Sequence, residues 1–258
     1  MLEIHRLHKI FHAGTPDERV AIDDVSLTLE RGDFAVVVGG NGAGKSTLLN
    51  MIAGEALPDS GFLRIDNHEI TRLPTHKRAR YVSRVFQDPA VGTAAALSIE
   101  ENLSVAARRG LLRTFGRGIT PALSAEFQTR LASFGLGLES RMKAQAGLLS
   151  GGQRQALSLL MAVYNKPELL LLDEHTAALD PKTAEKVMQV TSQVVAESGL
   201  TTLMVTHNMH HAITYGNRLI MMQQGRILAD LSGQRKQSMT AERLVAAFDD
   251  HSLLLAAA

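Results

Sequence analysis

The stretch Gly39-Gly40-Asn41-Gly42-Ala43-Gly44-Lys45-Ser46-Thr47 is the most informative part of this chain. It fits the pattern G-x-x-x-x-G-K-[ST], the phosphate-binding P-loop. The β-branched run 34–38 before it predicts a buried strand, and residues 48–53 after it predict a helix that Gly54 ends. A glycine-rich turn between strand and helix directs backbone N–H groups into one concavity, where the helix N-terminus favours anions. The stretch therefore predicts a nucleotide phosphate site.

Composition limits the size and the partners of the protein. The chain has 258 residues, and 45% of them are apolar, which suits one large or two small domains with a sizeable core. A net charge of +1 gives no reason to expect bulk attraction to nucleic acid or anionic lipid. There is no cysteine, which excludes disulfides and thiolate metal sites. No run approaches the roughly 20 apolar residues that span a bilayer, so work at a membrane would require a partner there.

Short apolar or alternating runs predict an α/β fold with right-handed crossovers. The expected strands are residues 2–4, 25–29, 34–38, 61–69, 81–86, 169–172, 201–206, 219–222 and 226–229. The expected helices outside the alanine-rich middle of the chain are 48–53, 181–198 and 240–248. We expect the basic segment 71–80 to be a solvated surface.

Residues 90–165 differ from the rest because alanine, leucine and arginine dominate and the periodicity becomes helical. Glu101 follows Ser98 by three residues, which is typical of a capped helix start. We expect a surface loop over 111–120, a helix over 121–134 and another over 156–164. Before the last helix, a serine and two glycines predict a second anion-binding site. We interpret the region as a helical insert in a sheet-based domain.

Polar residues follow two of the predicted strands. Asp173 and Glu174 come after the buried run 169–172, at the edge where open α/β sheets bind ligands. Asp173 fits a metal carboxylate, and Glu174 fits a base that orients or deprotonates a water. The alternative is an acidic strand end without a catalytic role. His207 follows the strand 201–206, and Phe11 either stacks on a purine base or covers the core.

The chain resembles an ABC transporter ATP-binding subunit over essentially its whole length. Residues 149–153, LSGGQ, match the signature of that family, which is much more specific than a P-loop. Gln87 matches the Q-loop, and residues 169–174 match the Walker B segment with its catalytic glutamate. Residues 178–180 match the D-loop, and His207 matches the switch histidine. These elements stand in the order that the family has.

The resemblance implies a single ABC ATPase domain over residues 1–258. Residues 1–89 and 166–258 would form a RecA-like core, with a parallel sheet, helices and an N-terminal antiparallel β subdomain. Residues 90–165 would form the inserted helical subdomain that carries the signature.

The resemblance also implies ATP and Mg²⁺ as cofactors, held between two copies of the chain that pair head to tail. Lys45 would reach the β- and γ-phosphates, and Glu174 would be the general base. His207 would hold the γ-phosphate and the water, Gln87 would contact Mg²⁺ or the water, and Asp180 would act across the interface. The implied ATP-binding residues are Phe11, Gly39, Gly40, Asn41, Gly42, Ala43, Gly44, Lys45, Ser46 and Thr47; the signature residues that reach the partner's ATP are Ser150, Gly151, Gly152 and Gln153; the residues around Mg²⁺ are Ser46, Gln87 and Asp173.

The implied function is ATP hydrolysis that powers separate transmembrane permease subunits, from the cytoplasmic face of the plasma membrane. Import of a small solute is the favoured direction, with an extracytoplasmic solute-binding protein as a further partner and no nucleic acid. His175 departs from the family, which commonly has proline after the glutamate. The run 173–180 is similar to a branch whose permeases resemble those for branched-chain amino acids, and some members are associated with uptake of aromatic amino acids. His175 either tunes Glu174 or packs.

Three other functions compete with import. An ATPase of an export or cell-envelope complex, of the lipoprotein or cell-division type, is the alternative that the sequence separates poorly. DNA-repair and chromosome-organising ATPases carry long heptad arms, for which the segment 90–165 is too short. Translation-associated ABC proteins fuse two ATPase domains, whereas this chain has one P-loop.

Overall fold

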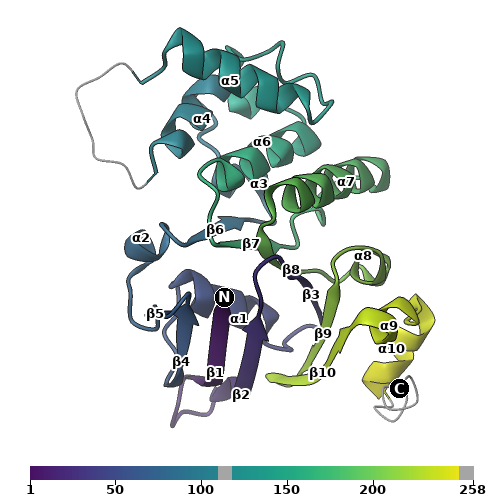
Figure 1. Ribbon diagram of the computed structural model, residues 1–258. Coiled ribbons are helices and arrows are strands. Elements are labelled where there is room, and N and C mark those ends of the chain that lie inside the picture. The colour runs from purple at the N-terminus through teal and green to yellow at the C-terminus, as the bar shows by residue number, and fades with distance from the viewer. Residues whose placement is uncertain (110–117, 250–258) are drawn as a thin grey trace.

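The structure, a computed structural model, describes residues 1–109 and 118–249, which form two β-sheets and a set of helices (Figure 1). The strands are β1 (Leu2–Phe11), β2 (Arg19–Leu29), β3 (Phe34–Val38), β4 (Ser60–Ile65), β5 (His68–Glu69), β6 (Val82–Val85), β7 (Leu169–Asp173), β8 (Thr201–Val205), β9 (Arg218–Gln223) and β10 (Arg226–Ser232). A six-stranded sheet has the order β10-β9-β3-β8-β7-β6 and is parallel except for β10. An antiparallel sheet has the order β2-β1-β4-β5. The predicted α/β fold is confirmed.

Helices pack against the six-stranded sheet and form most of the middle of the chain. They are α1 (Lys45–Ala53), α2 (Thr75–Arg78), α3 (Pro89–Gly92), α4 (Ile99–Ala107), α5 (Pro121–Ala132), α6 (Gly151–Val163), α7 (Pro181–Ser198), α8 (Met209–Thr214), α9 (Gly233–Gln237) and α10 (Ala241–Asp249), with a 3₁₀ turn at Ala146–Leu148. Figure 1 shows α4, α5 and α6 grouped together at one end of the molecule. Within the described residues, none of the helices is both long and apolar enough to cross a membrane.

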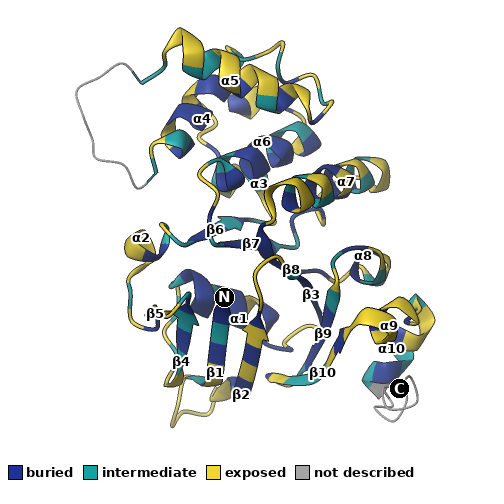
Figure 2. Cartoon of the chain, viewed as in Figure 1, coloured by how far each residue is buried: buried dark blue, intermediate teal, exposed yellow. Residues whose placement is uncertain are grey.

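Alternating side chains of β3 enter two different hydrophobic cores. Ala35 and Val37 pack in the core that α1 shares with the antiparallel sheet. Val36 and Val38 pack in the core that contains residues of α6, α7 and α8. Because both faces of the parallel sheet are covered, its central strands are continuous apolar runs. Strands β3 and β8 are buried along their whole length (Figure 2).

Local capping signals in the sequence were accurate. Ser98 caps α4 in a complete capping box with Glu101. Asp180 caps α7, and Gly199 ends that helix in the left-handed region with φ of 59°. The helix expected over 156–164 instead begins at Gly151 with Ser150 as its N-cap, so the predicted anion-binding turn is the first turn of α6 itself.

The basic segment 71–80 is not entirely solvated as expected, because Arg78 is only 1% exposed. Its guanidinium donates hydrogen bonds to the carbonyl oxygens of Met51 and Ile52, near the end of α1, and of Thr71. The last carbonyls of a helix lack partners within it, so a cation that supplies donors there is stabilising. Burial lowers the pKa of Arg78 to about 10. Helices α8 and α9 were not predicted from the sequence. The loop expected over 111–120 lies mostly outside the described residues.

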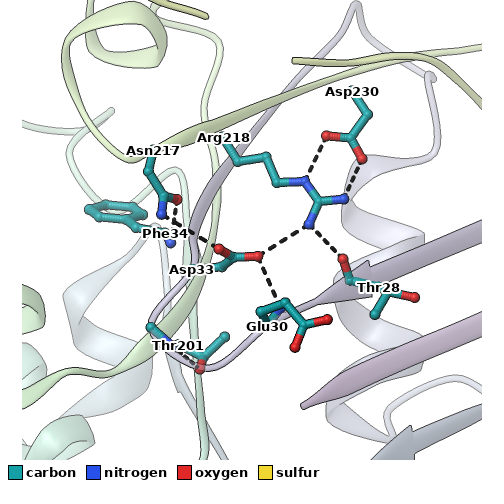
Figure 3. A network of polar contacts seen from close by, with 9 residues as sticks. Thr28, Glu30, Asp33, Phe34, Thr201, Asn217, Arg218 and Asp230 are labelled. Carbon is teal, nitrogen blue, oxygen red and sulfur yellow. Dashed lines mark hydrogen bonds and ion pairs between the residues drawn. The ribbon is translucent and has the colours of Figure 1, made fainter. Parts of the chain in front are cut away.

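A polar network holds the two sheets together where β3 and β9 begin (Figure 3). Arg218 of β9 contacts Asp33 at 3.2 Å and Asp230 of β10 at 2.5 Å. The same guanidinium donates to the carbonyl oxygen of Thr28 in β2 at 2.6 Å. Asn217 accepts a hydrogen bond from the backbone N–H of Phe34 at 2.9 Å. One cation therefore joins strands of both sheets at the end of the sheet opposite the P-loop.

Candidate active site

The P-loop lies so close to neighbouring strands that only glycine fits at two of its positions. Gly44 has φ of 100°, and a Cβ there would lie 2.5 Å from the carbonyl oxygen of Ala21 in β2. A Cβ on Gly39 would lie 2.3 Å from the carbonyl oxygen of Met222 in β9. Helix α1 begins immediately at Lys45, and no side chain caps its first turn. The N–H groups of that turn are thus available to an anion.

Lys45 is a buried cation that faces backbone oxygens. Its Nζ donates to the carbonyl oxygens of Gly39 at 2.8 Å and Gly40 at 3.0 Å. Burial lowers the pKa of Lys45, and the charges of Glu174 and Asp173 oppose that shift. In the described part of the chain, no carboxylate makes a salt bridge with this amino group. A buried cation without a salt-bridge partner fits a phosphate ligand.

Glu174 and His207 meet because β7 and β8 are neighbouring parallel strands that end at the same edge. The Nδ1 atom of His207 lies 3.1 Å from Oε2 of Glu174. Glu174 has φ of 43°, a left-handed conformation that costs a non-glycine residue about 1–3 kcal/mol and that clusters at active sites. The conformation turns the carboxylate off the line of the strand and towards the histidine that follows β8. The structure thus brings together two of the predicted catalytic residues.

Asp173 has a partner that the sequence analysis missed. Arg84 of β6 places Nη2 at 2.5 Å from Oδ2 of Asp173. The side chains of Arg84 and Asp173 are 11% and 16% exposed, so the pair is largely shielded from solvent. The one signal in the sequence is a charged residue in a short strand that begins and ends with valine, Val82 and Val85.

Three predicted metal ligands offer oxygen donors of the kind that Mg²⁺ prefers. Ser46 carries a hydroxyl and is exposed, Gln87 carries an exposed amide, and Asp173 carries a half-buried carboxylate. Mg²⁺ is usually held by one or two carboxylates together with the phosphates of a nucleotide, so this donor set fits the ion. Gln155 of α6 donates to the carbonyl oxygen of Phe86 at 3.1 Å and so holds the segment that leads to Gln87.

The signature residues lie at the start of α6, packed against α7 and the turn before it. The Ser150 hydroxyl accepts from the N–H of Gln153 at 3.3 Å, which completes a capping box. A Cβ on Gly152 would lie 2.2 Å from Cγ2 of Thr183, so only glycine allows the two helices to approach. Asp180 accepts from the N–H of Thr183 at 3.1 Å, and its hydrogen bonds to Thr183 lower its pKa. No hydrogen bond or salt bridge in the described residues connects 150–153 with the P-loop.

Exposure bears on two open alternatives. Phe11, at the end of β1, is 38% exposed, so part of its ring is open to a ligand, and Lys9 Nζ lies 5.5 Å from its ring centre. His175 is 2% exposed and places Nε2 at 3.2 Å from the hydroxyl of Thr191 in α7. Burial, aided by the charge of His211, lowers the pKa of His175 to about 3, so the ring is neutral. His175 therefore packs between the strand end and α7.

The parallel sheet, the phosphate loop after β3 and the acidic end of β7 define a P-loop ATPase. The match to a family model narrows the class: residues 22–177 match ABC transporter, and this chain belongs to that family.

Known proteins of the family resemble the chain over most of its length. The tyrosine transport ATP-binding protein of Clostridioides difficile is 41% identical over 249 residues, which are 96% of this chain and 99% of that protein. The spermidine/putrescine import ATP-binding protein PotA of Shigella flexneri is 35% identical over 83% of this chain, which spans about half (53%) of PotA. Among solved structures, a dimeric post-hydrolysis state of the ATP-binding cassette MJ0796, bound to ADP and phosphate, has a TM-score of 0.75 and 28% identity and covers 90% of this chain and 98% of that one.

Proposed function

We propose that this chain powers the uptake of an amino acid, through a permease made of separate subunits in the plasma membrane. The observation that carries the proposal is the 41% identity to a tyrosine transport ATP-binding protein over nearly the whole of both chains. The similarity to PotA, an import ATP-binding protein, supports the inward direction. In this proposal the chain binds at the cytoplasmic face of the membrane, and an extracytoplasmic solute-binding protein delivers the solute.

The proposed hydrolysis chemistry uses residues of one chain for the nucleotide and the water. Lys45 and the N–H groups at the start of α1 hold the phosphates, and the exposed ring of Phe11 stacks on adenine. Glu174 accepts the proton of the attacking water, and His207, with Nδ1 at 3.1 Å from Oε2, holds that carboxylate in place. The strained backbone at Glu174 supports this role.

The proposed metal ligands are Ser46, Gln87 and Asp173. When bound, Mg²⁺ would neutralise negative charge on the phosphate oxygens as the terminal phosphate is transferred. Asp173 is held by Arg84 on one of its two oxygens, and Ser46 lies at the start of α1 beside Lys45.

The proposed site is completed by a second copy of the chain. Ser150 and Gly151 are exposed at the start of α6, where Gly152 and Gln153 follow, and a helix start with free N–H groups suits the γ-phosphate of a partner's ATP. Asp180, exposed at the start of α7, lies on the same proposed interface. The dimeric cassette with ADP and phosphate supports this arrangement. In one chain, residues 1–89 and 166–258 form the proposed core and residues 90–165 the helical subdomain.

The test is purification of the tagged chain from solubilised membranes, identification of its partners by mass spectrometry, and reconstitution in vesicles. We expect a multispanning permease to copurify. With a matching binding protein outside, external tyrosine should accumulate only when ATP is enclosed with this chain. Accumulation of spermidine but not of tyrosine would overturn the amino-acid assignment. Efflux, or a permease that works without any binding protein, would point to an export or cell-envelope complex.

A further inference from the structure

Arg84 connects three elements of the ATP site. Nη2 lies 2.5 Å from Oδ2 of Asp173, the last residue of β7. Nη1 lies 2.9 Å from Oδ1 of Asn50, in α1, and 2.8 Å from Oε2 of Glu55, just beyond it. The same guanidinium lies 4.9 Å from the ring centre of Phe86, which immediately precedes Gln87 in the chain.

These contacts converge on segments that carry proposed ligands of the metal and the phosphates. Helix α1 begins with Lys45 and Ser46, β7 ends with Asp173, and β6 leads to Gln87. Strands β6 and β7 are paired neighbours, with Arg84 opposite Leu171. A single cation therefore sets the position of these segments relative to one another.

The guanidinium is held in place without Asp173. Asn50 and Glu55 bind Nη1, and the guanidinium carbon lies over the Phe86 ring, 4.9 Å from its centre. Arginine presents its donors in a rigid fork, so the two contacts of Nη1 and the packing against Phe86 also restrict the direction of Nη2. This is the geometry of a fixed support for the carboxylate, not of a mobile cation that moves away when a ligand arrives.

The support leaves one carboxylate oxygen open. Arg84 contacts Oδ2 of Asp173, and in the described part of the chain no hydrogen bond is made to Oδ1. A carboxylate that accepts a charge-assisted hydrogen bond on one oxygen is oriented by it, while the lone pairs of the other oxygen remain available to a hard cation or its water.

We propose that Arg84 is a positioning residue, which orients Asp173 so that Oδ1 meets the Mg²⁺ of bound Mg–ATP and fixes this carboxylate relative to α1 and Gln87. The inference rests on the proposed role of Asp173 as a metal ligand. Residues that orient metal ligands in this way typically change metal affinity 10–100-fold when they are replaced.

The test compares nucleotide binding with Mg²⁺ and in EDTA, using a fluorescent ATP analogue and the full chain. For Arg84→Met, we expect the gain in affinity that Mg²⁺ provides to fall about tenfold or more, with affinity in EDTA unchanged within about twofold. The Mg²⁺ concentration for half-maximal hydrolysis should rise by a similar factor. Arg84→Lys keeps one donor and should recover part of the loss, and Glu55→Gln, which loosens the anchor alone, should have an intermediate effect.

Arg64→Met is the matched control, because Arg64 also pairs with a carboxylate, Glu3 at 3.1 Å, and stacks on a phenylalanine, Phe62 at 5.1 Å. It should leave the Mg²⁺ dependence unchanged. Equal weakening of binding in EDTA and in Mg²⁺ would show that Arg84 only maintains packing, and a lower Mg²⁺ requirement in Arg84→Met would show that it blocks the site. Either result overturns the inference.

A parallel Asp173→Asn variant separates this inference from the proposed function. If Asp173→Asn leaves the Mg²⁺ dependence unchanged, the metal role of Asp173 fails and the role of Arg84 fails with it. If Asp173→Asn raises the Mg²⁺ requirement and Arg84→Met does not, only the role of Arg84 fails. Should Arg84→Met not fold, as thermal unfolding would show, Glu55→Gln and Arg84→Lys decide the question by the same measurements.

Discussion

The two ends of the six-stranded sheet carry the same kinds of charged group but satisfy them differently. Where β3 and β9 begin, Arg218 lies between Asp33 and Asp230 and also binds the backbone of β2 (Figure 3). Where the parallel strands end, Lys45 faces only backbone oxygens among the described residues. The charged groups of the first end are paired within the protein, whereas at the second end the buried Lys45 has no salt-bridge partner among the described residues, and a phosphate could supply one.

Each end of the sheet has one arginine that contacts two carboxylates. Arg218 contacts Asp33 and Asp230, and Arg84 contacts Glu55 and Asp173. Both side chains are largely buried, at 21% and 11% exposure. The difference lies in the partners: those of Arg218 connect strands, whereas Asp173 adjoins the proposed base. Substitutions at one end should therefore change stability, and substitutions at the other end should change nucleotide chemistry.

The largest expected effect is at the ligand end, in Glu174→Gln. Loss of a general base slows a reaction about 10²–10⁴-fold, and we expect the steady-state rate of ATP hydrolysis to fall by that factor. The amide keeps an oxygen that can accept from His207, so ATP affinity and the free energy of unfolding should stay close to wild type. Hydrolysis at the wild-type rate would remove Glu174 from the mechanism.

The next largest effect is expected for Arg218→Met, at the end of the sheet where β3 and β9 begin. The change leaves Asp33 and Asp230 without their shared cation, and we expect the free energy of unfolding to fall by about 2–3 kcal/mol in urea titrations. ATP affinity should not change. Arg226→Met is the control, because the Arg226 side chain is 66% exposed in its pair with Asp23 and such pairs contribute about 0–1 kcal/mol. Equal losses in the two variants would contradict the structural role of the network.

Lys45→Ala returns to the ligand end with a smaller expected effect. A hydrogen bond to a charged group contributes about 1.5–3 kcal/mol, so ATP affinity measured by titration should weaken at least about tenfold. The free energy of unfolding should change little, because the cost of burying this cation without a salt-bridge partner offsets its hydrogen bonds to the carbonyl oxygens. Unchanged affinity would mean that the nucleotide binds elsewhere. A loss of stability without a loss of binding would mean that Lys45 has a structural role, like Arg218.

Sequence signals were reliable where a structure depends on neighbouring residues. The P-loop, the capping box at Ser98 and the cap at Asp180 are formed by side chains and backbone within a few positions of one another. Burial of Arg78 against α1 and the contact of Arg84 with Asp173 were not predicted, because Met51 lies 27 positions from Arg78 and Asp173 lies 89 positions from Arg84. The residues next to an arginine do not reveal whether its side chain is exposed or buried. Only the tertiary arrangement decides between these outcomes.

The smallest expected effect concerns His175, which stands next to Glu174 in the chain and yet belongs to the packed interior. The pKa of this imidazole is about 3 in the folded protein, against about 6.5 in the unfolded chain. Between these values the unfolded state binds a proton that the native state does not. The free energy of unfolding therefore falls as the pH is lowered, by up to about 1.4 kcal/mol per pH unit from this residue.

His175→Met replaces the imidazole with an apolar group of similar size that does not titrate. Thr191 loses one contact, but its hydroxyl still donates to the carbonyl oxygen of Val187 at 2.8 Å. In urea titrations from pH 7 to pH 5, the free energy of unfolding should thus fall less in the variant than in wild type. The rate of ATP hydrolysis of the variant at pH 7 should stay within about twofold of wild type. The difference between the two proteins reports the titration of His175, including its interaction with the charge of His211. A parallel pH dependence with a large loss of hydrolysis would mean instead that His175 acts on Glu174 and belongs to the ligand end.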